Sequence, residues 1–490
     1  MKLKRIFALA CVISVTVSQA AWADVDQIAV LTKMVKEMEQ EMGNMKKVIE
    51  QQDSKIRQLE IKGPSSESAP QAADGGPAPV MTDKDFEDRL GIALGGSNKW
   101  IKDLKFSGDL RLRYEGQDFT SGDRTETDPR NRFRFRLRYG FEKKFNDQMK
   151  IGFAMASGEQ VGGTNVDPTS TNVTFDNLFN FKDIFIEKAF ATYTPNWAKI
   201  GPVEKLELTG GKFTNPFELG SSELIWDRDV KPEGAYEKID IRLIDTDNLN
   251  LKAYFIAGQF ILDEDATLGS PNATVASGDS QLYALQFGVN PVFYTPFLER
   301  PLDYLSAVSY YNYDNYANNR NFFIGGTSLA RGNPTSLGGS QLAARDFQVV
   351  EAYNEIAIYP YGLPTRFFFD FAVNPALSTQ ANQSGGGILH SNTAWSVGTR
   401  LGQLKLKGDW EARYEYRYIG ANAVVGAFND SDFGLGHSGK QGHVVKLAYM
   451  ITDSLTLAGS MFFVDNLNAG TGGVIDQQQR RFQLDLVWKF

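Results

Sequence analysis

Six arginines occupy alternate positions in two neighbouring segments of the chain, the spacing that places side chains on one face of a β-strand. They are Arg111, Arg113, Arg132, Arg134, Arg136 and Arg138, and we call them the arginine row. Guanidinium groups attract anions and bind carboxylates or phosphates through paired hydrogen bonds. The arginine row therefore predicts an electrostatic element that acts on charged solutes.

The residues between these arginines are aliphatic or aromatic. One face of the first segment carries Leu104, Phe106, Gly108, Leu110, Leu112 and Tyr114, and one face of the second carries Phe133, Phe135, Leu137, Tyr139 and Phe141. Six cations turned toward lipid would cost on the order of 12–24 kcal/mol, more than the roughly 5–15 kcal/mol that stabilises a domain. We therefore expect the aromatic face to contact lipid and the arginine row to face a water-filled interior. Taken alone, the row also fits the solvated face of a soluble sheet.

A second charged group lies in the segment 214–233. It contains the acids Glu218, Glu223, Asp227 and Asp229, close in sequence to Arg228 and Lys231. If this segment folds into the interior opposite the arginine row, the two form a narrow zone with a transverse electric field, which orients dipolar solutes and sorts ions. The alternative is an acidic loop on the surface.

Sixteen candidate strands follow residue 104, many of them alternating between apolar and polar residues. Their ranges are 104–115, 131–143, 147–157, 183–194, 203–213, 234–244, 248–259, 280–290, 302–313, 347–359, 365–374, 391–401, 404–418, 441–451, 455–465 and 479–490. Long connections alternate with mostly tight turns, which is typical of outer-membrane barrels. The pattern predicts an all-β fold over 104–490, a 16-stranded antiparallel transmembrane β-barrel wide enough for an aqueous channel. The segment 183–194 alternates poorly, and we assign it no faces.

The first hundred residues differ in composition from the rest. Residues 1–23 combine a basic start, an apolar run and an A-x-A site, and they predict a secretory signal peptide. The single cysteine, Cys11, lies in this run, so the remaining chain has no disulfides. Residues 62–82 are rich in Pro, Gly and Ser and predict a linker, and 83–94 predict a short amphipathic helix.

Residues 24–61 repeat apolar residues with spacings of three and four, which predicts a short N-terminal α-helical coiled coil preceding the barrel. Such a narrow apolar seam requires partner helices and leaves two or three strands open. A single amphipathic helix lying on its own domain is the alternative. We expect this segment in the periplasm.

No motif for catalysis, metal binding or a cofactor is found. H-E-x-x-H, C-x-x-C, the P-loop and G-x-S-x-G are absent, which argues against an enzyme. Asn429-Asp430-Ser431-Asp432 is better explained as an exposed turn than as a calcium site. The net charge of −8 argues against nucleic acid as a partner.

The barrel segment resembles the trimeric sixteen-stranded bacterial porins, and it is most similar to the putative-porin group related to phosphate-selective porins. The matching motifs are Gly-Asp-Leu-Arg-Leu-Arg-Tyr at 108–114, Arg-Phe-Arg-Leu-Arg-Tyr-Gly at 134–140, Gly-Lys-Phe-x-x-Pro-Phe at 211–217 and the terminal Phe490. The resemblance implies an in-folded loop at 214–233, a homotrimer, and recognition of Phe490 by the barrel-assembly machinery. The chain departs from dedicated phosphate channels because it has no comparable lysine cluster.

The function predicted on these grounds is a passive diffusion channel in the bacterial outer membrane. It would be surrounded by outer-membrane lipid, pass small hydrophilic solutes and ions, need no cofactor, and show a weak preference for anions because of the arginine row. The alternative is a structural role, such as a barrel sleeve around an electron-transfer protein. A lumen occupied by a partner protein would favour that alternative.

Overall fold

The computed structural model describes most of the chain from residue 104 onward. The described residues are 104–120, 129–161, 165–264, 279–295, 300–317, 319, 322, 329–334, 347–376, 392–467 and 478–490. The predicted signal peptide (1–23), coiled coil (24–61), linker (62–82) and short helix (83–94) lie outside them.

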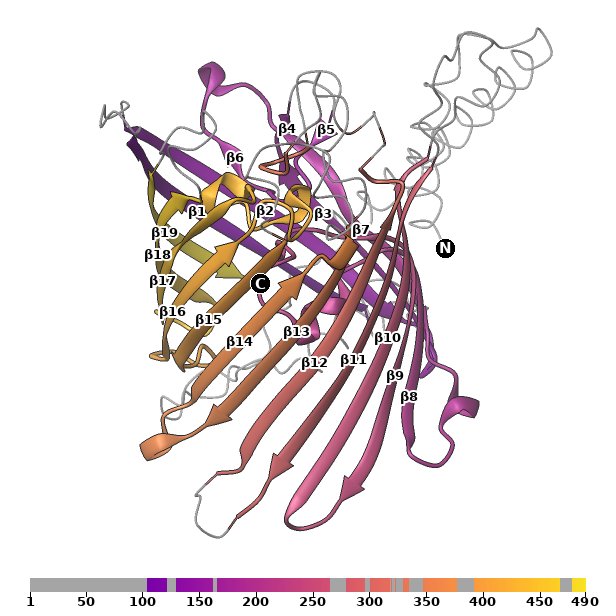
Figure 1. Ribbon diagram of the computed structural model, residues 1–490. Helices are drawn as coiled ribbons and strands as arrows, with labels where there is room; N and C mark the ends of the chain where they lie inside the picture. Colours follow the sequence, from indigo (N-terminus) through magenta and orange to yellow (C-terminus); the bar gives the residue numbers. More distant parts are fainter. Residues whose placement is uncertain are drawn as a thin grey trace, which may run out of the picture. The chain divides into compact units, whose positions relative to one another are not determined.

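Sixteen long antiparallel strands, each paired with the next, form a sheet that closes on itself (Figure 1). They are β1 (Leu104–Thr120), β2 (Arg130–Lys144), β3 (Met149–Gly158), β7 (Asp183–Tyr193), β8 (Val203–Lys212), β9 (Glu233–Asp245), β10 (Leu249–Asp263), β11 (Ser280–Phe293), β12 (Leu302–Asp314), β13 (Phe347–Ile358), β14 (Thr365–Val373), β15 (Thr393–Gly402), β16 (Trp410–Ile419), β17 (Lys440–Met450), β18 (Leu455–Asn466) and β19 (Gln478–Lys489). The predicted 16-stranded barrel is thereby confirmed. Three two-residue strands, β4 (Gln160–Val161), β5 (Asn165–Val166) and β6 (Val173–Thr174), lie in the connection between β3 and β7.

The two faces of the barrel wall differ in polarity because side chains alternate along each strand. In the β1–β2 ladder, Tyr114 opposes Phe133, and their rings contact each other on the outside at 5.3 Å. Arg113 opposes Arg134 in the same ladder, and both side chains are buried inside. The outer face is therefore apolar and the inner face polar, as the different costs of burying each in lipid require.

Strand β7 shows why 183–194 did not alternate in sequence. The β3–β7 ladder shifts register between Ala154 and Met155, which leaves an extra residue in β7. This bulge keeps Ile184 and Ile186 on the exposed outer face while Glu187 is buried. The bulge thus moves the alternation by one residue in the middle of the strand.

The barrel closes between β1 and β19. Phe490 and Gly108 exchange two backbone hydrogen bonds, at 2.8 and 3.1 Å, next to the end of β19. A Cβ atom at position 108 would lie 2.4 Å from the carbonyl oxygen of Arg138 and 2.6 Å from the Phe490 ring. Only glycine fits this seam without displacing its neighbours.

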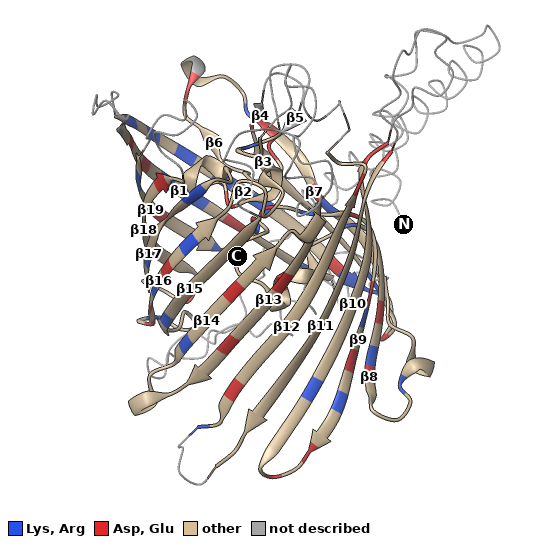
Figure 2. Ribbon diagram, in the orientation of Figure 1, with Lys and Arg blue, Asp and Glu red and all other residues tan. Residues whose placement is uncertain are grey.

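The interior is partly filled by the chain's own loops. The connection between β8 and β9, residues 213–232 (the β8–β9 loop), and the connection between β16 and β17, residues 420–439 (the β16–β17 loop), contribute buried apolar residues to a cluster with the inner faces of β10 to β13. Strand β11 carries no charged residue, and Figure 2 shows it in tan over its described length. Within the described part of the chain, no helix is both long and apolar enough to span a membrane.

Candidate functional site

The β8–β9 loop begins with a short 3-10 helix, η4 (Pro216–Gly220), set against the barrel wall. The side chain of Asn215 caps it by accepting a hydrogen bond from the backbone nitrogen of Phe217 at 3.1 Å. Phe217 is fully buried, and its ring lies 5.9 Å from Phe260 and 5.6 Å from Tyr311. The proline and the cap start the turn, and the phenylalanine holds it against β10 and β12.

The middle of the loop reaches the far side of the inner wall. Ser221 Oγ donates to Glu351 Oε1 on β13 at 2.6 Å, and the backbone nitrogen of Ser222 donates to Asp370 Oδ2 on β14 at 2.9 Å. Glu351 and Asp370 are fully buried by this contact. The loop therefore crosses the lumen and divides the space inside the barrel.

The β16–β17 loop meets the β8–β9 loop inside the lumen. The rings of Trp226 and Phe428 lie 5.2 Å apart, and the backbone nitrogen of Asp227 donates to the carbonyl oxygen of Phe428 at 2.7 Å. Asp227 Oδ2 in turn accepts a hydrogen bond from the backbone nitrogen of Ser431 at 2.8 Å. The two loops thus form one continuous structure across the channel.

Four members of the arginine row are paired with carboxylates. The pairs are Arg113 with Asp485 (2.7 Å), Arg132 with Glu115 (2.8 Å), Arg136 with Asp109 (2.6 Å) and Arg138 with Asp229 (2.6 Å). The last pair joins the row to the β8–β9 loop, as the facing arrangement predicted from sequence requires. The pairing relieves the repulsion between neighbouring guanidinium groups, which would otherwise be severe at low dielectric.

Arg111 and Arg134 are held differently. Arg111 donates to the side chain of Asn172, and Arg134 donates to the backbone oxygen of the same residue at 3.1 Å. Among the described residues, no carboxylate lies within 4.0 Å of Arg111, while Arg134 has Glu115 at 3.8 Å. These two side chains keep more of their positive charge uncompensated.

The four predicted loop acids lie in two kinds of surroundings. Two of them, Glu223 and Asp229, stay ionised. Glu223 accepts from Arg417 at 2.9 Å and from Lys446 at 3.2 Å. Burial disfavours its charged form, but these cations and their neighbours outweigh burial and hold the pKa of Glu223 well below its ordinary value. The same balance applies to Asp229, where Arg138 is the nearest cation and lowers the pKa to about 2.

The other two loop acids are poorly placed to act on solutes as anions. Burial, together with the negative charges of Asp229 and Asp430, raises the pKa of Asp227 well above its ordinary value. Its oxygens are also used by two backbone nitrogens. Burial raises the pKa of Glu218, whose Oε1 has no hydrogen-bond partner among the described residues.

Asn429-Asp430-Ser431-Asp432 was predicted to be an exposed turn, and the predicted exposure is wrong. Asn429 and Asp430 are buried inside the barrel. Asp430 pairs with Arg417 at 2.6 Å, and Asp432 pairs with Arg481 at 2.9 Å. These acids balance cations of the inner wall. In the part of the chain that the structure describes, no group of three or more His, Cys, Asp or Glu side chains could hold a metal ion.

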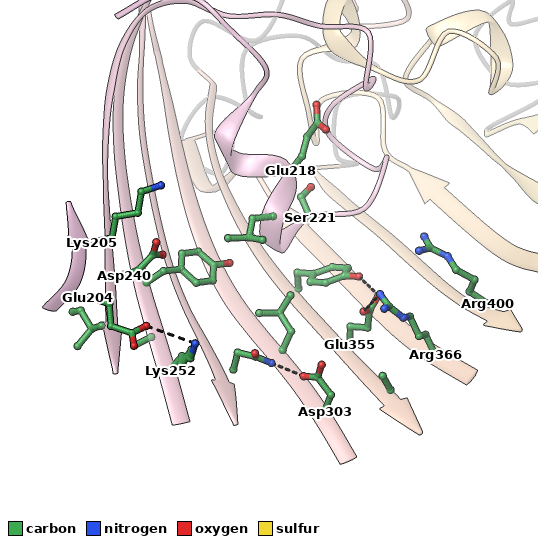
Figure 3. A pocket seen from close by; sticks show the side chains of 18 of the residues that line it. Glu204, Lys205, Glu218, Ser221, Asp240, Lys252, Asp303, Glu355, Arg366 and Arg400 are labelled. Carbon is green, nitrogen blue, oxygen red and sulfur yellow. Dashed lines mark hydrogen bonds and ion pairs between the residues drawn. The ribbon is translucent and has the colours of Figure 1, made fainter. Parts of the chain in front are cut away.

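In the described part of the chain, cavities lie on several sides of the β8–β9 loop. A loop-side cavity of about 360 Å³ lies between the arginine row and the β16–β17 loop. A turn-side cavity of about 750 Å³ lies toward the short turns, where Glu204 pairs with Lys252 and Glu355 with Arg366 (Figure 3). A seam cavity of about 450 Å³ lies beside Phe490.

The loop-side and turn-side cavities are each lined by equal numbers of basic and acidic side chains. Six basic and six acidic side chains line the loop-side cavity, and five of each line the turn-side cavity. Figure 2 shows blue and red positions interspersed along the wall near β1, β2 and β16. Such a lumen is polar and wet without a strong excess of either charge.

Sequence reasoning missed several of these groups. Arg417 and Glu415 lie on the charged face of β16, whose alternation was visible in sequence and was the available signal. Asn172 offered no such signal, and Arg228 stood out in the sequence only as one of two cations among the acids of the segment 214–233.

A closed sixteen-stranded barrel with an apolar outside, a polar lumen and a loop crossing that lumen defines a channel-forming β-barrel of the bacterial outer membrane. The chain belongs to the family described as "Putative porin", whose model matches residues 124–336 and 343–490. No curated protein matches the chain in sequence.

Solved structures of outer-membrane proteins are similar at low identity. The high-pH structure of Pseudomonas putida OprB is 12% identical with a TM-score of 0.44, covering 82% of this chain and 97% of that one. The outer membrane channel DcaP of Acinetobacter baumannii is 12% identical with a TM-score of 0.39, covering 79% of this chain and 97% of that one. The loop L8 deletion mutant of OmpT from Vibrio cholerae is 11% identical with a TM-score of 0.39, covering 79% and 99%.

Proposed function

We propose that this porin is a passive diffusion channel for small hydrophilic solutes and ions, with a weak preference for anions. The observation that carries the proposal is the divided but polar lumen, in which cavities of about 360 and 750 Å³ lie on the two sides of the β8–β9 loop. Sixteen strands enclose enough space for an aqueous path past that loop.

The test is a planar bilayer recording of the purified, folded porin. Stable single-channel steps that rise with salt concentration are expected. A folded protein that gives no conductance would contradict the channel function.

The anion preference rests on Arg111 and Arg134, which the wall acids compensate least, and on the exposed Arg228. It is weak because basic and acidic side chains line the loop-side and turn-side cavities in equal numbers. The reversal potential in a potassium chloride gradient measures it, and a strong cation preference would show that the loop acids control the pore.

The alternative, a sleeve around a partner protein, is less well supported. The lumen already contains the β8–β9 and β16–β17 loops, and residues such as Trp226 and Phe428 pack there on each other. A folded partner would have to displace both loops. A protein that co-purifies inside the barrel would favour the sleeve.

The functional unit is a homotrimer, with 24–61 in the periplasm as a coiled coil. Its support is the heptad spacing of this segment, whose apolar seam requires partner helices. The segment 1–23 directs export, and Phe490 is recognised by the barrel-assembly machinery. Deleting 24–61 should lower the trimer fraction of the detergent-solubilised protein measured by light scattering, and an unchanged trimer would leave that segment without a part in assembly.

A further inference from the structure

One arginine of the β8–β9 loop, Arg228, stands where the cavities meet. It is the only residue in the described chain that lines the loop-side, turn-side and seam cavities together. The turn-side and seam cavities share Glu218 besides, and the loop-side and seam cavities share Arg138. A solute that moves from one side of the loop to the other therefore passes the Arg228 side chain.

The guanidinium of Arg228 is more accessible than those of the arginine row. Its side chain is 57% exposed, whereas the side chain of Arg138 is 18% exposed and that of Arg113 is 4% exposed. Among the described residues its single ion pair joins Nε to Glu223 Oε1 at 3.3 Å. The outer edge of the guanidinium thus remains available for a passing anion, which it can hold through two parallel hydrogen bonds.

The backbone beneath Arg228 is fixed on both sides. The nitrogen of Asp227 donates to the oxygen of Phe428 at 2.7 Å, and the nitrogen of Asp229 donates to Asp227 Oδ1 at 2.7 Å. Asp229 is also tied to Arg138. Arg228 is therefore a flexible charged side chain on a rigid support, positioned by its neighbours.

The support does not depend on Arg228 itself. Glu223, the partner of Arg228, also contacts Arg417, Lys446 and Arg413 at 2.9, 3.2 and 3.7 Å. Glu223 therefore stays compensated when Arg228 turns away or is replaced. Substitutions at this position change the charge of the passage and leave the fold of the loop in place.

We propose that Arg228 contributes more to the ion preference of the channel than any residue of the arginine row, by binding the anionic group of a solute as it passes between the cavities. This inference rests on the proposed channel function. Within the arginine row, Arg138 is paired with Asp229 of the β8–β9 loop, and Arg113, Arg132 and Arg136 are paired with acids of the barrel wall, so most of the charge of the row is compensated.

The experiment compares reversal potentials of Arg228→Gln, Arg228→Lys and Arg228→Glu in a potassium chloride gradient. Arg228→Gln should lower the chloride-to-potassium permeability ratio by roughly threefold and so abolish the weak anion preference, the effect of one unit charge a few ångströms from the path in salt water. Arg228→Lys should retain most of the preference, and Arg228→Glu should favour potassium.

Arg366→Gln is the matched control. Arg366 is 46% exposed, has one ion pair with Glu355 at 3.1 Å, and lines the turn-side cavity without reaching the other two. Arg366→Gln should change the chloride-to-potassium permeability ratio by less than half as much as Arg228→Gln does. An unchanged permeability ratio in Arg228→Gln, or an equal change in Arg366→Gln, would overturn the assignment to Arg228. A folded wild-type protein that gives no conductance would overturn the channel function instead.

A cysteine at position 228 allows the charge to be changed after the channel has folded and opened. The chain contains one cysteine, Cys11, so Arg228→Cys in a Cys11→Ser background has a single thiol. A cationic methanethiosulfonate reagent applied to the open channel should restore the anion preference, and an anionic one should shift it toward potassium. If both reagents react and neither changes the reversal potential, Arg228 does not face the path.

Discussion

At the scale of single residues, many of the wall charges form a network in which one acid is shared by several cations, as Glu223 is by Arg413, Arg417 and Lys446. Arg417 is fully buried and contacts Glu415, Asp430 and Glu223 at once. Removing one member of such a network leaves a buried charge without compensation, which is more costly than never having buried the pair. The network therefore fixes the positions of both in-folded loops as much as it sets the potential of the lumen.

The pair between Asp229 and Arg138 makes the stability of the loop depend on pH. The folded carboxyl has a pKa of about 2, below the ordinary value of about 4, so its contribution is full above about pH 4 and disappears as the pH falls toward 2. Asp229→Asn should lower the free energy of unfolding by about 2 kcal/mol at pH 7. Urea titrations in detergent, followed by tryptophan fluorescence, measure this loss and its decline with acid.

Asp147→Asn, in the exposed turn between β2 and β3, is the control for Asp229. It should leave the urea midpoint of unfolding unchanged at pH 7 and at pH 2.5. A loss for Asp229→Asn that stays constant from pH 7 to pH 2.5 would mean that its charge does not stabilise the loop.

The types of these residues could be predicted from the sequence, but their partners could not. Alternation identified the arginine row and its opposite aromatic face, because the period of a strand is local. The partner of Arg113, Asp485, lies 372 positions away, and joins it only because β19 closes the barrel against β1. No local pattern carries that information.

At the scale of elements, the strands were predictable and the inward loops only partly so. All sixteen strands were found, and most of them repeat their period several times, but β16 begins at Trp410 rather than at the predicted residue 404. The loop at 214–233 was expected in the lumen from a resemblance and its acids. Nothing in the sequence indicated that the β16–β17 loop folds into the lumen. Its buried residues, such as Ala423 and Val425, are of types that also occur in exposed loops.

Trp226 should control how firmly the β8–β9 loop is held. Its side chain is 2% exposed and contacts Tyr311 and Phe428. Trp226→Ala should cost about 3–5 kcal/mol of stability through the cavity it leaves. Because the loop divides the lumen, a loosened loop should also raise the single-channel conductance and its current noise, both read from bilayer recordings.

Leu219→Ala is the matched variant for Trp226, because Leu219 lies on the same loop and is 47% exposed. Its conductance and noise should equal those of the wild type. If Trp226→Ala folds and conducts like Leu219→Ala, packing of the tryptophan does not limit the movement of the loop.

At the scale of the whole molecule, closing the sheet removes the unpaired strand edges that a membrane does not tolerate. The seam is made by a ladder of twelve residue pairs from Asp109–Lys489 to Thr120–Gln478, extended by the two hydrogen bonds of Gly108 with Phe490. The C-terminal residue is thus part of the wall. A change at this end affects the barrel as a unit rather than one strand.

Gly108→Val should impair closure of the barrel. Its side chain would press on the Arg138 carbonyl and the Phe490 ring, so the last pair of the seam has to separate. The expected effect is a loss of about 1–3 kcal/mol, typical of inserting carbons into a packed site, and a smaller folded fraction on refolding into detergent. Gly116→Ala on the same strand is the control, since its Cβ would come only within 3.3 Å of the flexible Asn131 side chain. The folded fraction is read from the gel mobility of unheated samples, and equal fractions for the two variants would show that the Gly108–Phe490 contact does not limit closure.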